Sequence, residues 1–145
     1  MRLAATISGD AYGSGAPLVV DSSAWLRQRE PGVGGRWRAT LNAGLLASCP
    51  VAALEITSVA RDEAEFGRLD TALAQLIQAP VTRSACEAAV AASRSLKGSR
   101  RLPAADYLIA AAAAERGFGV LHQDRHFDLL ATVLGFESVR LEPEA

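Results

Sequence analysis

The sequence has little of what would place it in several large classes of protein. Its two cysteines, Cys49 and Cys86, lie far apart without C-x-x-C spacing, so we expect buried thiols in a reducing compartment rather than a metal site. No apolar run approaches membrane-spanning length and no signal peptide opens the chain, which favours a soluble, cytoplasmic protein. No G-x-G-x-x-G follows the first apolar run, which argues against a dinucleotide-binding domain.

An excess of charge of one sign is also missing. The 145 residues carry a net charge of −1, so no overall basic field draws the chain to nucleic acid. Lys97 is the only lysine, and every other cation is an arginine. Arginine makes forked contacts to phosphate that lysine cannot make, although a GC-rich genome explains most of this bias. Half of the residues are apolar and many are alanine, which favours a helix-rich single domain.

The apolar run at 18–20 ends in Asp21, and a helical pattern follows at once. Such a run is typical of a buried strand in a parallel sheet. Strand-like and helical segments then alternate, which predicts an α/β fold with a parallel central sheet and helices on both faces. We expect strands over 18–21, 45–48, 119–122 and 138–141, and helices over 22–29, 35–44, 50–60, 62–78, 83–96, 103–116 and 125–134. Residues 1–17 are rich in Gly, Ser and Ala, and we expect a flexible leader before a single domain at 18–145.

Four acids from separated stretches fall at matching places in this pattern. Asp21 and Asp124 end apolar strands, and Asp106 lies in the first turn of a helix, where the helix dipole favours a carboxylate. Glu55 interrupts the apolar stripe of the helix at 50–60. The carboxyl ends of parallel strands form one edge, where these acids can meet. Clustered carboxylates repel one another unless a dication joins them, and Mg²⁺ and Mn²⁺ prefer oxygen ligands. The set therefore indicates metal-assisted phosphodiester hydrolysis.

Each acid also has a purely structural explanation. Asp21 and Asp124 can cap the helices that follow them, and Asp106 can complement a helix dipole. Asp128 lies four residues after Asp124, on the same helix face, and can be a solvated acid. Glu55 is the hardest to explain in this way, because burying an unpaired carboxylate is costly. Taken together, the four acids favour the functional interpretation.

Four short motifs, taken in order, resemble those of a PIN domain, specifically a VapC-type toxin ribonuclease of a bacterial toxin–antitoxin pair. They are V-V-D-S-S-A-W at 19–25, P-V-A-A-L-E at 50–55, P-A-A-D-Y-L-I-A-A at 103–111 and H-Q-D-R-H-F-D at 122–128. Each motif is weak alone, but their order and spacing over about 18–141 are specific. Members of this family usually begin almost at the first strand, so residues 1–17 leave the true start of the protein open.

The resemblance implies an α/β/α sandwich with an acidic pocket that holds Mg²⁺ or Mn²⁺. It further implies endonucleolytic cleavage of RNA and a cognate antitoxin that wraps the toxin and blocks the pocket. By motif position, the catalytic and metal-binding acids would be Asp21, Glu55, Asp106 and Asp124. Ser23 would be a polar helper and Asp128 an auxiliary acid.

Other residues are weaker candidates for RNA contacts, metal binding or contact with a partner. Contacts to the RNA backbone would come from the arginines Arg27, Arg29, Arg100, Arg101 and Arg125, each of which can equally be solvated charge. His122 and His126 have no partner at metal-site spacing, and we expect His126 at the surface. The apolar face around Phe66, Leu69 and Leu73 predicts contact with a second copy of the chain or an antitoxin, unless it is intramolecular core.

Two other functions fit part of this pattern. An inactive PIN-like module that serves interaction alone would not need all four acids. A phosphoacceptor domain of the receiver type also places an acid at a strand end, but its chemistry needs a lysine near a later strand end. Lys97 lies instead beside Gly98, which ends a predicted helix. The sequence therefore favours a metal-dependent endoribonuclease toxin.

Overall fold

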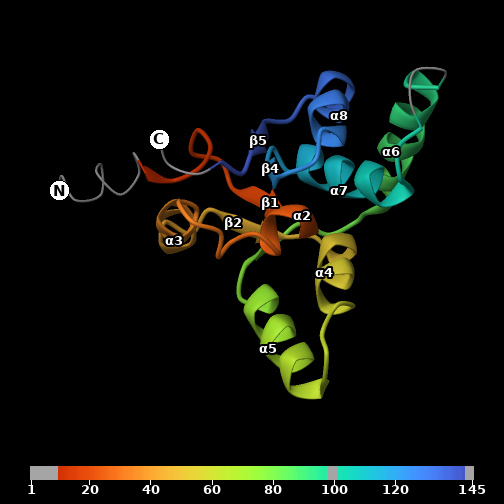
Figure 1. The fold of residues 1–145 in the computed structure, drawn as a ribbon. Coiled ribbons are helices and arrows are strands. Elements are labelled where there is room, and N and C mark those ends of the chain that lie inside the picture. The colour runs from red at the N-terminus through yellow and green to blue at the C-terminus, as the bar shows by residue number, and fades with distance from the viewer. Residues whose placement is uncertain (1–9, 98–100, 143–145) are drawn as a thin grey trace.

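A wholly parallel five-stranded sheet, with helices on both faces, forms the centre of the protein (Figure 1). The structure is a computed structural model and describes residues 10–97 and 101–142. The strands lie in the order β3-β2-β1-β4-β5 and are β1 (Leu18–Val20), β2 (Leu46–Ser48), β3 (Ile77–Gln78), β4 (Gly119–His122) and β5 (Ser138–Arg140). The helices are α2 (Ser22–Trp25), α3 (Gly34–Asn42), α4 (Pro50–Thr57), α5 (Glu63–Ala74), α6 (Arg83–Ser95), α7 (Ala104–Glu115) and α8 (His126–Leu134). The predicted α/β fold is confirmed.

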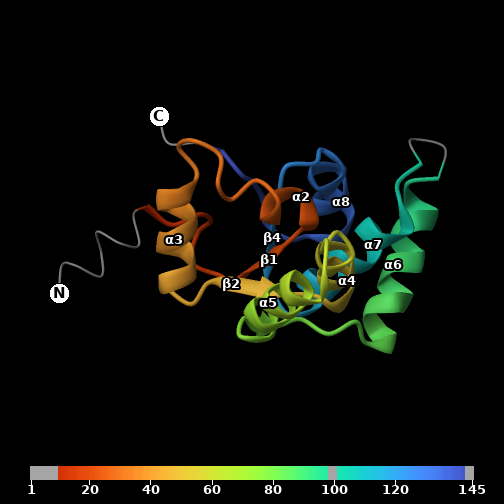
Figure 2. The same ribbon diagram turned by 60° about the horizontal axis from the view of Figure 1, so that its bottom comes forward.

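Strand β1 explains how both faces of the sheet are filled. Successive side chains of a strand point to opposite faces, and all three residues of β1 are buried. Val19 packs into a core formed mainly by α6, α7 and α8, with Ala52 of α4. Leu18 and Val20 pack on the other face with residues of α2 and α3. Figure 2 shows α6, α7 and α8 grouped at the side of the molecule opposite to α3.

The edge strand β3 is an element that the sequence did not predict. We expected one helix over 62–78, but α5 ends at Ala74, and Ile77 and Gln78 pair in parallel with Ala47 and Ser48 of β2. Two residues are too few to show the alternation that identifies a strand, and the apolar Leu76 and Ile77 continue the helical spacing of α5. The predicted helix over 22–29 is similarly shortened to the single turn of α2.

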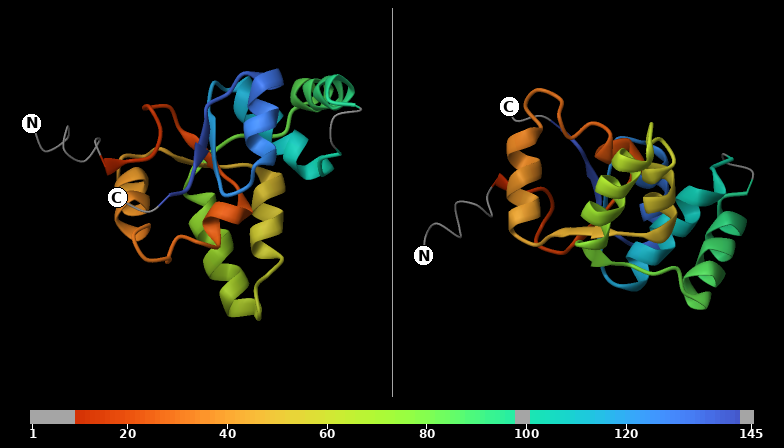
Figure 3. Two further views of the ribbon diagram at one scale, coloured as in Figure 1. Left: turned by 45° about the horizontal axis from the view of Figure 1, so that its top comes forward. Right: turned by 90° about the horizontal axis from the view of Figure 1, so that it is seen from below.

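The segment before β1 packs against the domain. Tyr12 is 1% exposed, its backbone N–H donates to Thr40 Oγ1 at 2.9 Å, and its hydroxyl donates to the carbonyl of Glu142 at 2.8 Å. The Arg36 guanidinium lies 4.0 Å from the centre of the Tyr12 ring. In both views of Figure 3 this segment lies beside α3. We expected 1–17 to be a leader outside the fold; the described part, 10–17, contributes to the core, and 1–9 lie outside the described residues.

The two cysteines lie in different surroundings. Cys49 is buried, as expected, and burial raises the pKa of its thiol. The same expectation for Cys86 is wrong, because α6 turns Ala85 and Ala89 toward the core and leaves Cys86 exposed. Within 10–97 and 101–142, no helix is both long and apolar enough to cross a membrane.

Candidate active site

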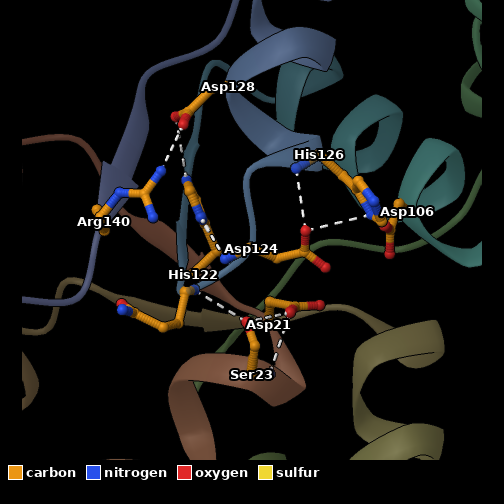
Figure 4. Close-up of polar contacts among 9 residues, drawn as sticks. Asp21, Ser23, Asp106, His122, Asp124, His126, Asp128 and Arg140 are labelled. Carbon is orange, nitrogen blue, oxygen red and sulfur yellow. Dashed lines mark hydrogen bonds and ion pairs between the residues drawn. The ribbon is translucent and has the colours of Figure 1, made fainter. Parts of the chain in front are cut away.

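Three of the four predicted acids meet at the carboxyl edge of the two central strands (Figure 4). Asp21 directly follows β1, and Asp124 lies two residues after the end of β4. These strands are neighbours in parallel register, with Val20 opposite Leu121, so the acids that follow them emerge at the same edge. Asp106 lies in the first turn of α7, and its charge interacts with those of Asp21 and Asp124.

Ser23 joins the two strand ends that carry Asp21 and Asp124. Asp21 is only 4% exposed, and its Oδ2 accepts hydrogen bonds from the Ser23 backbone N–H at 3.0 Å and from the Ser23 hydroxyl at 2.6 Å. The same hydroxyl accepts a hydrogen bond from the backbone N–H of Gln123 at 2.9 Å. Ser23, which the sequence suggested as a polar helper, therefore fixes the Asp21 carboxylate and the loop that leads to Asp124.

A histidine lies between two of the acids. His126 Nδ1 is 2.7 Å from Asp106 Oδ2 and 3.2 Å from Asp124 Oδ1, and the three side chains could hold a metal ion together. The backbone N–H of His126 also donates to Asp124 Oδ1 at 3.0 Å. We expected His126 at the surface, but its side chain is 24% exposed and faces the acids. Its position two residues after a candidate acid was the signal that could have identified it.

Glu55 lies at the margin of this group. Its Oε1 accepts a hydrogen bond from the Ser22 hydroxyl at 3.3 Å. Partial burial raises the pKa of Glu55, and the negative charge of Asp21 raises it further. The apolar stripe that we predicted around Glu55 does not face the core, since Leu54 and Val59 are 69% and 52% exposed. Helix α4 buries Ala52, Ile56 and Thr57 instead, and Glu55 lies between the two surfaces.

Asp128 points away from the other acids and takes part in a separate hydrogen-bond chain (Figure 4). Its carboxylate accepts hydrogen bonds from the Ser138 hydroxyl and from Arg140, both at 2.7 Å. Ser138 Oγ lies 2.7 Å from Nε2 of the fully buried His122, whose Nδ1 accepts the Asp124 backbone N–H at 3.1 Å. Nε2 therefore carries the ring proton. Burial lowers the pKa of His122 and favours this neutral form. Asp128 thus supports the loop at Asp124 from outside the site.

The candidate RNA-contacting arginines are exposed where the structure describes them. Arg27 pairs with Glu30 at 3.2 Å, and Arg29 and Arg101 lie on the surface. Arg125 is exposed directly beside Asp124 and is the one that the chain places next to the acids. Arg100 lies outside the described residues.

The buried Asp106 predicts a distinct dependence of stability on pH. Burial raises its pKa from 3.8 to about 6, with further contributions from Asp21 and Asp124, while the hydrogen bond from His126 opposes the shift. A pKa that is higher in the folded state stabilises the fold fully below about pH 4, and this contribution is lost as the pH rises through 6. A shift of this size corresponds to at most about 3 kcal/mol.

We therefore expect the metal-free protein to lose stability between about pH 4 and 6, and Asp106→Asn to lose less over the same range. Thermal melts in chelator across this pH range, for both proteins, measure the difference. Melting curves that shift in parallel for the two proteins would show that Asp106 does not titrate in this way.

Comparisons with known proteins agree with this geometry. Residues 18–133 match the PIN domain family. The chain is 37% identical over 122 residues to ribonuclease VapC51 of Mycobacterium tuberculosis, covering 81% of this chain and 87% of that protein. It is 33% identical over 121 residues to ribonuclease VapC18 of the same organism, covering 80% of this chain and 88% of that protein.

A solved structure shows the same fold. VapBC-5 from Mycobacterium tuberculosis, a member of the VapBC family of toxin–antitoxin systems, matches with a TM-score of 0.64 and 24% identity. The match covers 86% of this chain and 98% of that chain. The sheet order, the position of the acids and these matches lead to one assignment: the chain belongs to the PIN-domain family and, within it, to the VapC ribonucleases.

Proposed function

We propose that the protein is the toxin of a toxin–antitoxin pair and hydrolyses RNA phosphodiester bonds at the acidic edge of its sheet. The observation that carries the proposal is the convergence of Asp21, Asp106 and Asp124 on the carboxyl ends of β1 and β4. The identity to two VapC ribonucleases supports RNA as the substrate. We assign the role of catalytic acids to these three residues and to Glu55, which lies near Asp21.

The donor set fits a divalent cation. Asp21 and Asp106 are almost completely buried, and among the described residues His126 is the one basic side chain paired with these acids. The pKa of Asp106 is raised mainly by burial and also by its acidic neighbours, so added positive charge would stabilise its ionised form. Carboxylate oxygens are the ligands that Mg²⁺ and Mn²⁺ prefer. We propose that Asp21, Glu55, Asp106 and Asp124 hold Mg²⁺ or Mn²⁺.

The chain itself would supply the geometry of the reaction. When bound, a dication neutralises charge on a phosphoryl oxygen and lowers the pKa of a water ligand. Ser23 orients Asp21, and the backbone N–H of His126, at the start of α8, orients Asp124. The chain from Asp128 through Ser138 and His122 fixes the backbone N–H of Asp124. Arg125, exposed beside Asp124, would bind the RNA backbone, with Arg27, Arg29 and Arg101 further out.

The proposal predicts that RNA cleavage depends on a metal ion. We expect purified protein to cleave RNA in Mg²⁺ or Mn²⁺, to stop when chelator is in excess, and to resume when the metal is restored. Asp21→Asn protein, purified in the same way, is the control, because any cleavage that remains in this inactive variant comes from a contaminating nuclease. Full cleavage in excess chelator by the wild-type protein, with none by the variant, would contradict a metal-dependent mechanism.

We also propose that a cognate antitoxin or a second copy of the chain binds the apolar surface formed by α4, α5 and the turn between them. Leu54, Val59 and Phe66 are 69%, 52% and 42% exposed on these packed helices, whereas Leu73 of the predicted stripe is buried. Exposed apolar patches of this kind mark interfaces. The relation to a VapBC-family fold makes an antitoxin the first partner to test.

Phe66→Glu should weaken this association at least about tenfold, because a charge would be buried at the interface. Val90→Glu on α6 is the matched control, since Val90 is 65% exposed on a different helix. Light scattering measures the self-association, and titration with the protein encoded by the neighbouring gene measures antitoxin binding. A monomer that ignores this protein, or equal effects of both substitutions, would contradict the proposed surface.

A further inference from the structure

We propose that His126 is itself a metal ligand of the acidic site, and that its imidazole nitrogen makes the site prefer Mn²⁺ over Mg²⁺. The inference rests on the proposed function, since it concerns the metal of the same site. None of the four acids assigned to the site provides a nitrogen donor, so His126 changes the chemical class of the ligand set.

The geometry places Nδ1 of His126 where a ligand of the shared metal would be. It lies within 2.7 Å of Asp106 Oδ2 and 3.2 Å of Asp124 Oδ1, and one ligand atom from each residue falls within 4.8 Å of the others. A cation that binds both carboxylates therefore lies within reach of this nitrogen. Figure 4 shows the ring directed toward Asp106 and Asp124, and the side chain is 24% exposed.

The position of His126 is fixed by the fold. It is the first residue of α8, and its backbone N–H donates to Asp124 Oδ1 at 3.0 Å, which ties the two residues into one turn. The next residue, Phe127, is completely buried and anchors the start of the helix. Helix α8 packs on α7, which carries Asp106. The imidazole is therefore held at the acids by two helices and is already oriented for a metal.

The chemistry of the donor decides the selectivity. Mg²⁺ takes oxygen ligands almost exclusively, whereas affinity for an imidazole nitrogen rises along the series from Mn²⁺ to Co²⁺ and Ni²⁺. Replacing an oxygen donor by Nδ1 therefore gains more for Mn²⁺ than for Mg²⁺. The alternative is that His126 is a positioning residue that only donates a hydrogen bond to Asp106. In that case both ions would lose affinity together when His126 is replaced.

Binding of each ion to the protein without RNA distinguishes the two roles. Calorimetric titration with Mg²⁺ and with Mn²⁺ compares the wild type with His126→Asn and His126→Asp. We expect His126→Asn to lower Mn²⁺ affinity about tenfold or more and Mg²⁺ affinity less than about threefold. His126→Asp supplies an oxygen donor and should reverse the preference. Val133→Asn, at an exposed position of the same helix, is the matched control and should leave both affinities unchanged.

A spectroscopic readout identifies the ligand directly. The chain has two histidines, and both ring nitrogens of His122 are already engaged within the fold. Co²⁺-loaded protein should therefore show one strongly shifted imidazole N–H proton signal in NMR spectra. The signal should disappear in His126→Asn, while thermal melts confirm that this variant is folded.

The results separate the inference from the proposed function. An unchanged ratio of Mn²⁺ to Mg²⁺ affinity in His126→Asn, or a shifted signal that persists in this variant, would overturn the role of His126. RNA cleavage by the wild type would still stand. A wild type that binds Mn²⁺ through His126 but cleaves no RNA would instead overturn the proposed function and leave the ligand assignment intact.

Discussion

Asp21→Asn should reduce RNA cleavage roughly a thousandfold or more while leaving the fold intact. Asparagine keeps the shape of the side chain and can still accept the hydrogen bonds from Ser23. It removes a negative charge from the proposed dication site. The same result is expected for Glu55→Gln, Asp106→Asn and Asp124→Asn, and a double variant should be little worse than a single one, because the acids act as a unit.

Two further variants make this prediction specific. Asp70→Asn makes the same chemical change on the exposed face of α5 and should keep wild-type cleavage. Asp128→Asn should show only a partial loss, because Asp128 acts on Asp124 through Ser138 and His122. RNA-cleavage assays measure the activity of each variant, and thermal melts with and without Mg²⁺ show whether the variant is folded. Wild-type cleavage by Asp106→Asn or Asp124→Asn would refute the shared site, and loss of activity through unfolding would make these acids structural.

Gly119→Ala should destabilise the protein by about 2 to 3 kcal/mol and lower its Tm by roughly 5 to 10 °C. Gly119 begins β4 between β1 and the approach to β5, and a Cβ there would lie 2.6 Å from the carbonyl oxygen of Glu137 and 2.8 Å from Leu18 Cδ2. The carbonyl cannot move away freely, since it accepts the backbone N–H of Val120 at 2.9 Å. The clash therefore has to be relieved by moving a central strand.

Gly67→Ala is the matched control for this substitution. Gly67 lies inside α5, and a Cβ there would meet nothing within 4 Å. Alanine in a helix interior is more stable than glycine by about 0.5 to 1 kcal/mol, so this variant should melt slightly higher than the wild type. Chemical denaturation of both variants measures the two effects. A Gly119→Ala protein as stable as the wild type would show that the strands have room to separate here.

Periodicity and strand-end chemistry were enough to predict the architecture. The apolar run of β1 followed by Asp21 and the proline and glycine at the ends of α7 are local signals, and they gave elements close to those observed. Strand β3 was missed because its two residues form an edge strand only through pairing with β2. Pairing of this kind depends on residues about thirty positions away, which no local pattern records.

The candidate site was predictable only in part, because some of its contacts join residues of different elements. The four acids each mark the end or the first turns of an element, so the sequence could suggest their convergence. Helix α4 is apolar on nearly every side, and its sequence therefore did not reveal that Leu54 faces solvent while Ile56 faces the core. His126 was misplaced because its partner Asp106 lies on another helix. The assignment of these residues as metal ligands stays a prediction.

The hydrogen bond from Gln123 to Ser23 joins residues 100 positions apart, and this separation has a consequence during synthesis. A ribosome that has added the first hundred residues has made Asp21 and Glu55, but neither β4 beside β1 nor Asp106 and Asp124. At about 5 to 20 residues per second, the remaining stretch takes a few seconds to complete. A truncated chain released in this interval carries no complete acidic site. The proposed nuclease site is therefore complete only after translation of the chain is nearly finished.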